Sequence, residues 1–374
     1  MGEGEDAARP RKRCKVAIGF CSPCPRDVAL MTIGSRHRIR KTQRQQATNA
    51  SPAHRVSIYG LPRAERPVLY RMSRDRMDLQ RASVPTRNQY DRVRQIQAVG
   101  NFHKAIWLLR NKTTGQLAVR KEFDAGDVAS GFAAREISHV IRLSNCANIC
   151  TYREHELNLA TGTGALVMNV YAYGDLWALL EKHINQRKRF HEGFIWHVFR
   201  SLAQALRHMQ RGDPPVLSNT YDWIMHRDIY PRNIFLGLPA SHEPSWPKVV
   251  LGDFGSSISS VDSWQAIELR QQQDFSPQPF ELPNNKRSDV YQVGLVIVAL
   301  CRLTIQPKHQ SHWFQGSPAG GTYTPMLNDI LTRCLENSPV NRVSAMELYQ
   351  VLNTRFIGGG SLHGLLLEAP MYQS

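Results

Sequence analysis

Apolar and polar residues alternate early in the central part of the chain, which is the spacing of β-strands. Residues 94–100 and 104–123 read as strands, and Thr and Gly at residues 114–115 interrupt the second run, which predicts a turn there. Residues 130–144 place their apolar side chains at helical spacing. Residues 165–183 combine a buried strand, a short link and a helix. We therefore expect strands to dominate the first third of the folded domain.

Helical patterns dominate the remainder. Residues 192–210 predict a long amphipathic helix, and residues 289–303 are almost wholly apolar, which suits a helix buried on all sides. Residues 325–336 and 344–352 predict further amphipathic helices. This order predicts an α+β fold, in which a small, mainly β lobe precedes a larger, mainly helical lobe and a cleft lies between them.

Residues 1–90 show neither the strand spacing nor the helical spacing of apolar residues, and they carry most of the net charge. The 374-residue chain has a formal charge of +16, of which residues 1–90 supply +12, from 19 Lys and Arg against 7 Asp and Glu. We predict that this segment is a disordered basic arm. The run Arg9–Lys15 reads either as a solvated charge run or as a patch for nuclear targeting, nucleic acid or an acidic partner.

The chain has no run of 18 or more apolar residues, and its first residues lack the apolar stretch of a secretory signal. We therefore expect no contact with a membrane. Seven scattered cysteines without such a signal indicate free thiols in a reducing compartment. Together these features predict a cytoplasmic and/or nuclear location.

Two short motifs carry the candidate chemistry. His-Arg-Asp at residues 226–228 is followed by Asn233, and Asp-Phe-Gly stands at residues 253–255. A hairpin pattern over residues 234–251 joins the two motifs. Asn233 and Asp253 are oxygen ligands from two loops, and such ligands suit Mg²⁺.

With these motifs in this order, residues 91–356 resemble the protein kinases, most closely the NIMA-related and divergent fungal serine/threonine kinases. VRKEFDAG, at residues 119–126, and VVLGDFG, at residues 249–255, carry the likeness. The resemblance implies a bilobal protein-kinase-like fold. Its parts are an N-lobe over residues 91–168, a hinge over 169–174, a C-lobe over 175–356 and a C-terminal tail over 357–374.

The resemblance also implies a reaction, the transfer of the ATP γ-phosphate to hydroxyl groups of a protein substrate, with Mg²⁺. Serine and threonine are the expected acceptors. Asp228 orients the acceptor hydroxyl in this scheme, and Asn233 and Asp253 bind the metal. Asp289 matches the buried residue that braces the catalytic loop of these enzymes.

On the nucleotide side, Lys121 is the expected anchor of the α- and β-phosphates, because it lies six residues after Gly115. Its expected partner is Glu136, in the predicted helix. Arg120 stays an alternative anchor, because adjacent strand residues face opposite sides. Further nucleotide contacts are expected from the glycine-rich loop and the hinge, namely from Gly100, Phe102, Met168 and Val170.

The chain departs from the kinase pattern in three places. In the glycine-rich loop only Gly100 is kept, and His103 stands where the third glycine is expected. At the end of the activation segment, either Gln278 replaces the glutamate that pairs with an arginine, here Arg342, or Glu281 is that glutamate in a shifted register.

The third departure is Tyr230, where serine/threonine kinases carry a lysine beside the transferring phosphate. Loss of one such electrostatic contact costs about 2.7–4 kcal/mol of barrier. Arg232, four residues after Asp228, has the spacing of the tyrosine-kinase arginine, and we expect it to supply the missing charge. Three interpretations remain: an active kinase of reduced rate, a pseudokinase that acts as a nucleotide-binding or scaffolding module, and a mainly nucleic-acid-binding protein, which only the basic arm favours.

Overall fold

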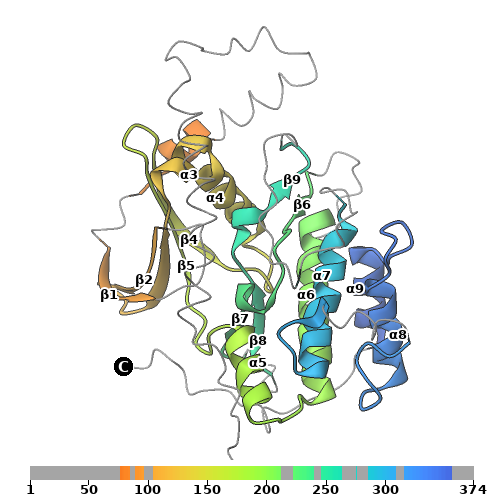
Figure 1. Ribbon diagram of the computed structural model, residues 1–374. Helices are drawn as coiled ribbons and strands as arrows, with labels where there is room; N and C mark the ends of the chain where they lie inside the picture. Colours follow the sequence, from red (N-terminus) through yellow and green to blue (C-terminus); the bar gives the residue numbers. More distant parts are fainter. Residues whose placement is uncertain are drawn as a thin grey trace, which may run out of the picture. The chain divides into compact units, whose positions relative to one another are not determined.

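The computed structural model describes most of the chain from residue 76 to residue 355. The described ranges are 76–84, 89–96, 104–211, 222–239, 246–262, 275, 285–308 and 316–355. Within them an antiparallel sheet is followed by a mainly helical region (Figure 1), which confirms the predicted order. Among these residues, no helix has the length and apolar character needed to cross a membrane.

The sheet has five antiparallel strands in the order β1-β2-β3-β5-β4. The strands are β1 (Tyr90–Ile96), β2 (Ala105–Asn111), β3 (Leu117–Glu122), β4 (Tyr152–Asn158) and β5 (Thr163–Asn169). β2 and β3 form the predicted hairpin, and Gly115 in its turn has a left-handed φ of 68° that suits glycine. Lys121 lies opposite Ile106 of β2 and Leu166 of β5, so it occupies the middle of the sheet.

Two helices follow the first three strands: α3 (Ala125–Ser130) and α4 (Phe132–Leu143). Gly131 ends α3 and precedes α4 with a φ of 87°, an angle that costs other residues roughly 1–2 kcal/mol. The sequence pattern predicted one helix over residues 130–144, and this glycine divides that stretch from α3. The apolar face of α4 is buried in the core.

A short helix over residues 76–81, orange in Figure 1, packs beside α4 and β4. The guanidinium of Arg76 donates to the carbonyl oxygen of Ser130 at 2.7 Å. Nε2 of His155, in β4, lies 2.8 Å from the carbonyl oxygen of Leu79. The helix is therefore tied to the end of α3 and to the sheet by hydrogen bonds between side chains and main chain.

This helix corrects the prediction of a disordered arm over residues 1–90 at the end of that segment. A six-residue helix is too short to be stable alone, so tertiary contacts fix it, and the hydrophobic pattern does not reveal them. Residues 1–75, with the run Arg9–Lys15, lie outside the described residues.

The second part of the fold is mainly helical. Its helices are α5 (Leu176–Asn185), α6 (Glu192–Arg211), α7 (Arg287–Arg302), α8 (Pro325–Cys334) and α9 (Ala345–Arg355). α6 contacts both α7 and α9 (Figure 1). Every residue of α7 from Ser288 to Cys301 is buried, which confirms the predicted helix buried on all sides.

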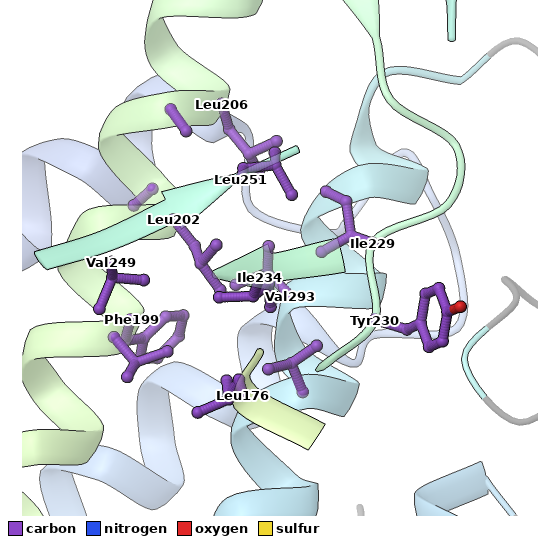
Figure 2. Close-up of a cluster of buried hydrophobic side chains, with 14 of the residues drawn as sticks. Leu176, Phe199, Leu202, Leu206, Ile229, Tyr230, Ile234, Val249, Leu251 and Val293 are labelled. Carbon is purple, nitrogen blue, oxygen red and sulfur yellow. The ribbon is translucent and has the colours of Figure 1, made fainter. Parts of the chain in front are cut away.

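Short elements between α6 and α7 carry the candidate site. They are β6 (Ile224–Met225), the 3₁₀ turn η3 (Pro231–Asn233), β7 (Ile234–Gly237), β8 (Lys248–Leu251), the 3₁₀ turn η4 (Phe254–Ser256) and β9 (Ile258–Ser259). β7 pairs with β8, and β6 pairs with β9. Ile229 and Ile234 point into a cluster with Leu202 and Val293 (Figure 2), so the loop between β6 and β7 is seated on the core.

Candidate active site

Lys121 lies in a buried cluster of charged groups, which we call the anchoring cluster (Lys121, Glu136 and Asp253). Nζ of Lys121 is 2.7 Å from Oε1 of Glu136 and 2.8 Å from Oδ1 of Asp253. β3, α4 and the loop after β8 each supply one member. The neighbouring Arg120 pairs instead with Glu156 of β4 at 2.6 Å. Of the two candidate basic residues, Lys121 is therefore the one in the cluster.

The charges in the anchoring cluster stabilise one another. Burial lowers the pKa of Lys121, but the carboxylates of Asp253 and Glu136 outweigh burial and raise that pKa above its ordinary value. Burial also opposes ionisation of Asp253, yet the ammonium of Lys121 holds the pKa of Asp253 below its usual range. Burial raises the pKa of Glu136, against the effect of Lys121. At neutral pH the cluster therefore presents an ammonium and an ionised Asp253 carboxylate.

Asp228 lies in the loop between β6 and η3, where the amide of Asn233 holds it. Nδ2 of Asn233 donates to the main-chain oxygen of Asp228 at 2.8 Å and to its Oδ2 at 3.2 Å. Since the amide nitrogen faces Asp228, the amide oxygen of Asn233 is directed elsewhere. The main-chain nitrogen of Gly252 donates to the main-chain oxygen of Asn233 at 2.8 Å, so this loop lies beside the residue that precedes Asp253.

Helix α7 holds the main chain of the same loop. The Asp289 carboxylate accepts from the main-chain nitrogens of His226 and Arg227, each at 2.9 Å. Oε1 of Gln292 accepts from the main-chain nitrogen of Ile229 at 3.2 Å. Arg227 has a φ of 69°, and such a conformation persists only where the surroundings hold it. Burial raises the pKa of Asp289 to about 6, and its two main-chain donors oppose this rise.

Tyr230 and Arg232 follow Asp228 in the same loop, and Tyr230 is buried, with 7% of its surface exposed. The main chain of Tyr230 is extended, and the centre of its ring lies 6.2 Å from the centre of the buried Phe275 ring. The guanidinium of Arg232 is 4.5 Å from the centre of the Trp177 ring. Burial raises the pKa of Tyr230, and the positive charge of Arg232 opposes this rise. The field of Arg232 therefore reaches the Tyr230 hydroxyl.

Met168 and Val170 flank the end of β5. Met168 pairs with Val119, which lies two residues before Lys121 in β3, and Val170 is half-buried just beyond the strand. The structure thus places both residues within the same sheet region as the anchoring cluster.

Other predicted site residues lie outside the described residues: Gly100, Phe102, His103, Gln278 and Glu281. Arg342, the expected partner of the glutamate or glutamine, is buried. Its Nε donates to the carbonyl oxygen of Glu336 at 2.9 Å, and its guanidinium lies 4.7 Å from the centre of the Tyr291 ring.

Sequence reasoning did not single out His139 and Ser257. Nδ1 of His139 lies 2.7 Å from Oγ of Ser257, and both side chains are buried. The signal in the sequence is that His139 follows Glu136 by three residues, which places the two on one helix face.

Residues 98–356 match the family model described as the protein kinase domain, and the chain belongs to this family. It is 26% identical over 257 residues to the serine/threonine-protein kinase Nek2 of Mus musculus. It is 28% identical over 225 residues to the G2-specific protein kinase fin1 of Schizosaccharomyces pombe, and 25% identical over 263 residues to the G2-specific protein kinase nimA of Emericella nidulans. The resemblance to NIMA-related kinases is thereby confirmed as a distant homology.

These alignments cover 65%, 55% and 63% of this chain, respectively. They cover 55% of Nek2, 29% of fin1 and 37% of nimA. The chain therefore spans about half or less of the length of these relatives.

Proposed function

We propose that the chain is an active protein kinase that transfers the γ-phosphate of ATP to hydroxyl groups of proteins, with serine and threonine as acceptors. The anchoring cluster carries this proposal, because a buried ammonium between two carboxylates is suited to hold phosphates. The distant homology to serine/threonine kinases supports the choice of acceptor.

On the acceptor side, Asp228 accepts a hydrogen bond from the substrate hydroxyl and takes its proton as the phosphoryl group moves. The amide of Asn233 holds the Asp228 carboxylate in one orientation. Tyr230 offers one uncharged donor near this point. Arg232, held over Trp177, supplies the positive charge that Tyr230 lacks.

On the nucleotide side, Lys121 binds the α- and β-phosphates while Glu136 fixes its position. The carboxylate of Glu136 is 2.7 Å from the ammonium, so the lysine is oriented before nucleotide arrives. The remaining nucleotide contacts come from the loop and hinge residues Gly100, Phe102, Met168 and Val170.

The residues present also fit a divalent cation. Lys121 favours the ionised form of Asp253, and the amide oxygen of Asn233 is directed away from Asp228. Oxygen ligands of this kind suit Mg²⁺, which keeps several waters and takes phosphate oxygens as well. Asn233 and Asp253 would hold the ion, which when bound neutralises charge on the phosphates.

One observation favours a second function, that of a pseudokinase binding nucleotide or acting as a scaffold. Tyr230 carries no positive charge, and the guanidinium of Arg232 is stacked on Trp177. If stacking keeps this charge from the transferring phosphate, the anchoring cluster would bind nucleotide without efficient transfer.

The test is transfer of label from γ-labelled ATP, with Mg²⁺, to the chain itself and to a general protein substrate. Wild type should produce phosphoserine and phosphothreonine after acid hydrolysis, and a chelator should stop the reaction. Asp228→Asn should transfer about 10²- to 10⁴-fold less. Asp329→Asn, an exposed carboxylate in α8, should behave as wild type.

Three results would change the proposal. Nucleotide binding without transfer by wild type would favour the pseudokinase. Phosphotyrosine as the product would overturn the choice of acceptor. Equal transfer by wild type and D228N would remove Asp228 from the reaction.

A further inference from the structure

Helix α4 presents a row of polar side chains spaced by three residues, which share one helix face. Glu136 holds Lys121 of the anchoring cluster at 2.7 Å. Arg142, two turns further on, pairs with Asp222 at 2.9 Å. His139 lies between them, is only 2% exposed, and takes no part in the reaction proposed above.

His139 donates a hydrogen bond to Ser257. Nδ1 of His139 lies 2.7 Å from Oγ of Ser257, and that Oγ lies 2.5 Å from the carbonyl oxygen of Phe254. A carbonyl only accepts, so the hydroxyl proton of Ser257 is directed at Phe254, and Nδ1 of His139 must carry the proton that it shares with Ser257. Burial lowers the pKa of His139 well below its ordinary value, and the charges of Arg142 and Arg135 lower it further. The ring is therefore neutral.

The other nitrogen of this ring faces a carboxylate. Nε2 of His139 is 3.8 Å from Oδ2 of Asp262, beyond hydrogen-bond distance. Oδ2 of Asp262 accepts instead from the main-chain nitrogen of Ser259. The short contact of His139 is thus the one with Ser257.

Ser257 closes the turn that follows Asp253. Its main-chain nitrogen donates to the Phe254 carbonyl at 3.1 Å, so its amide and its hydroxyl hold the same oxygen. Asp253 lies directly before this turn with a φ of 59°, a conformation that costs on the order of 1–3 kcal/mol where the surroundings do not hold it. A side chain that fixes Ser257 therefore also helps to hold the main chain of Asp253 in this conformation.

We propose that His139 is a positioning residue for phosphoryl transfer: through Ser257 it holds α4, and with it Glu136, against the turn that carries Asp253. The inference rests on the proposed function. The hydrogen bond between His139 and Ser257 is an uncharged link between α4 and the turn. It acts beside the charged link that Lys121 makes with Glu136 and Asp253. A shift of about 1 Å at reacting groups costs on the order of 10² in rate, so a loose tie should reduce turnover.

Two variants of matched size test the hydrogen bond. In His139→Asn the side-chain amide nitrogen takes the place of Nδ1 and keeps a donor, whereas His139→Leu has nearly the same size and no donor. We expect the kcat of H139L to fall roughly tenfold or more, with a smaller change in KM for ATP. The kcat of H139N should stay within about threefold of wild type.

A double-mutant cycle identifies the partner. Ser257→Ala removes the acceptor and should lower kcat as H139L does, and the double variant should be no slower than either single variant. If H139L does not fold, the expected fall in kcat is tested with S257A alone, and H139N serves as the folded control.

The outcomes separate this inference from the proposed function. A wild type that transfers phosphate while H139L and S257A match it overturns the inference alone. Independent, multiplying losses in the double variant, or an H139N as slow as H139L, also overturn it. A wild type that transfers no phosphate overturns the proposed function and the inference with it.

Discussion

The anchoring cluster and the catalytic loop are built in different ways. The anchoring cluster joins three charged side chains from distant parts of the chain, and the ion pair between Lys121 and Asp253 links residues 132 positions apart. The candidate catalytic loop, residues 226–233, is one continuous segment, held through main-chain nitrogens by Asp289 and Gln292 of α7.

This difference bears on the departure from the kinase pattern at Tyr230. A cluster made of paired side chains does not tolerate replacement of one member, because the others become uncompensated buried charges. A loop held by its main chain keeps its shape when a side chain that makes none of these main-chain hydrogen bonds changes, as at Tyr230. Substitutions should therefore cost stability in the anchoring cluster and cost mainly activity in the catalytic loop.

The largest effect should come from Lys121→Met. The substitution leaves Glu136 and Asp253 buried without their cation, which should lower the free energy of unfolding by about 3–5 kcal/mol and remove phosphate transfer. Urea denaturation and label transfer measure the two effects.

Arg120→Met is the matched control for this variant. It changes the adjacent residue, which pairs with Glu156 rather than with the anchoring cluster, so transfer should persist. Equal loss of transfer in both variants would contradict the assignment of Lys121 as the phosphate anchor.

The next effect concerns Arg232→Ala in the catalytic loop. Loss of its charge should lower transfer by about 10²-fold, while loss of stacking on Trp177 should lower the free energy of unfolding by only about 0.5–1 kcal/mol. Arg232→Lys should fall between R232A and wild type in rate. Unchanged transfer by R232A would show that this arginine does not replace the missing lysine.

A smaller effect is the pH dependence contributed by His139, whose folded-state pKa is depressed. Such a group adds stability above its unfolded pKa of about 6.5 and loses it as the pH falls, with a slope of up to about 1.4 kcal/mol per pH unit. Arg135 and Arg142 favour the neutral ring, and Asp262, at 3.8 Å, opposes them.

H139N lacks this titration, so it isolates the contribution of the ring. The stability of wild type relative to H139N should decline between pH 7 and pH 5, as measured by urea denaturation. Parallel stability curves for the two proteins would contradict a neutral buried ring.

The smallest effect concerns the helix over residues 76–81, which contacts the end of α3. Arg76→Ala removes the hydrogen bond to Ser130 and should cost about 0.5–1 kcal/mol of stability. Arg81→Ala removes only an exposed ion pair with Asp78 at 3.7 Å and should cost close to nothing. Equal costs would show that the helix contributes nothing through Arg76.

Much of the fold could be predicted from the sequence, because apolar residues recur with clear helical or strand spacing in its central elements. The apolar run of α7 predicts burial on all sides, and the hairpin between β2 and β3 follows from its turn residues. The helix over residues 76–81 could not be predicted, because it depends on partners in α3 and β4. The division at Gly131 depends on a single left-handed residue within a helical pattern.

The candidate site also has residues that the sequence predicts and residues that it does not. The spacing of Asp228, Asn233 and Asp253 marks the catalytic region in the sequence. The sequence favoured Lys121 and left Arg120 as an alternative, because the final choice depends on which face of β3 meets α4. The contact of His139 joins it to a serine 118 positions away, and no local pattern indicates such a pair.

The central claim is that Asp228 and the anchoring cluster form a working phosphotransferase. The most direct measurement is the single-turnover rate of phosphate transfer at saturating Mg²⁺ and ATP, for wild type and D228N, with nucleotide affinity measured by calorimetry. We predict similar affinities and a rate about 10²- to 10⁴-fold lower in D228N. Equal rates in the two proteins, or tight nucleotide binding with no transfer by wild type, would contradict the claim.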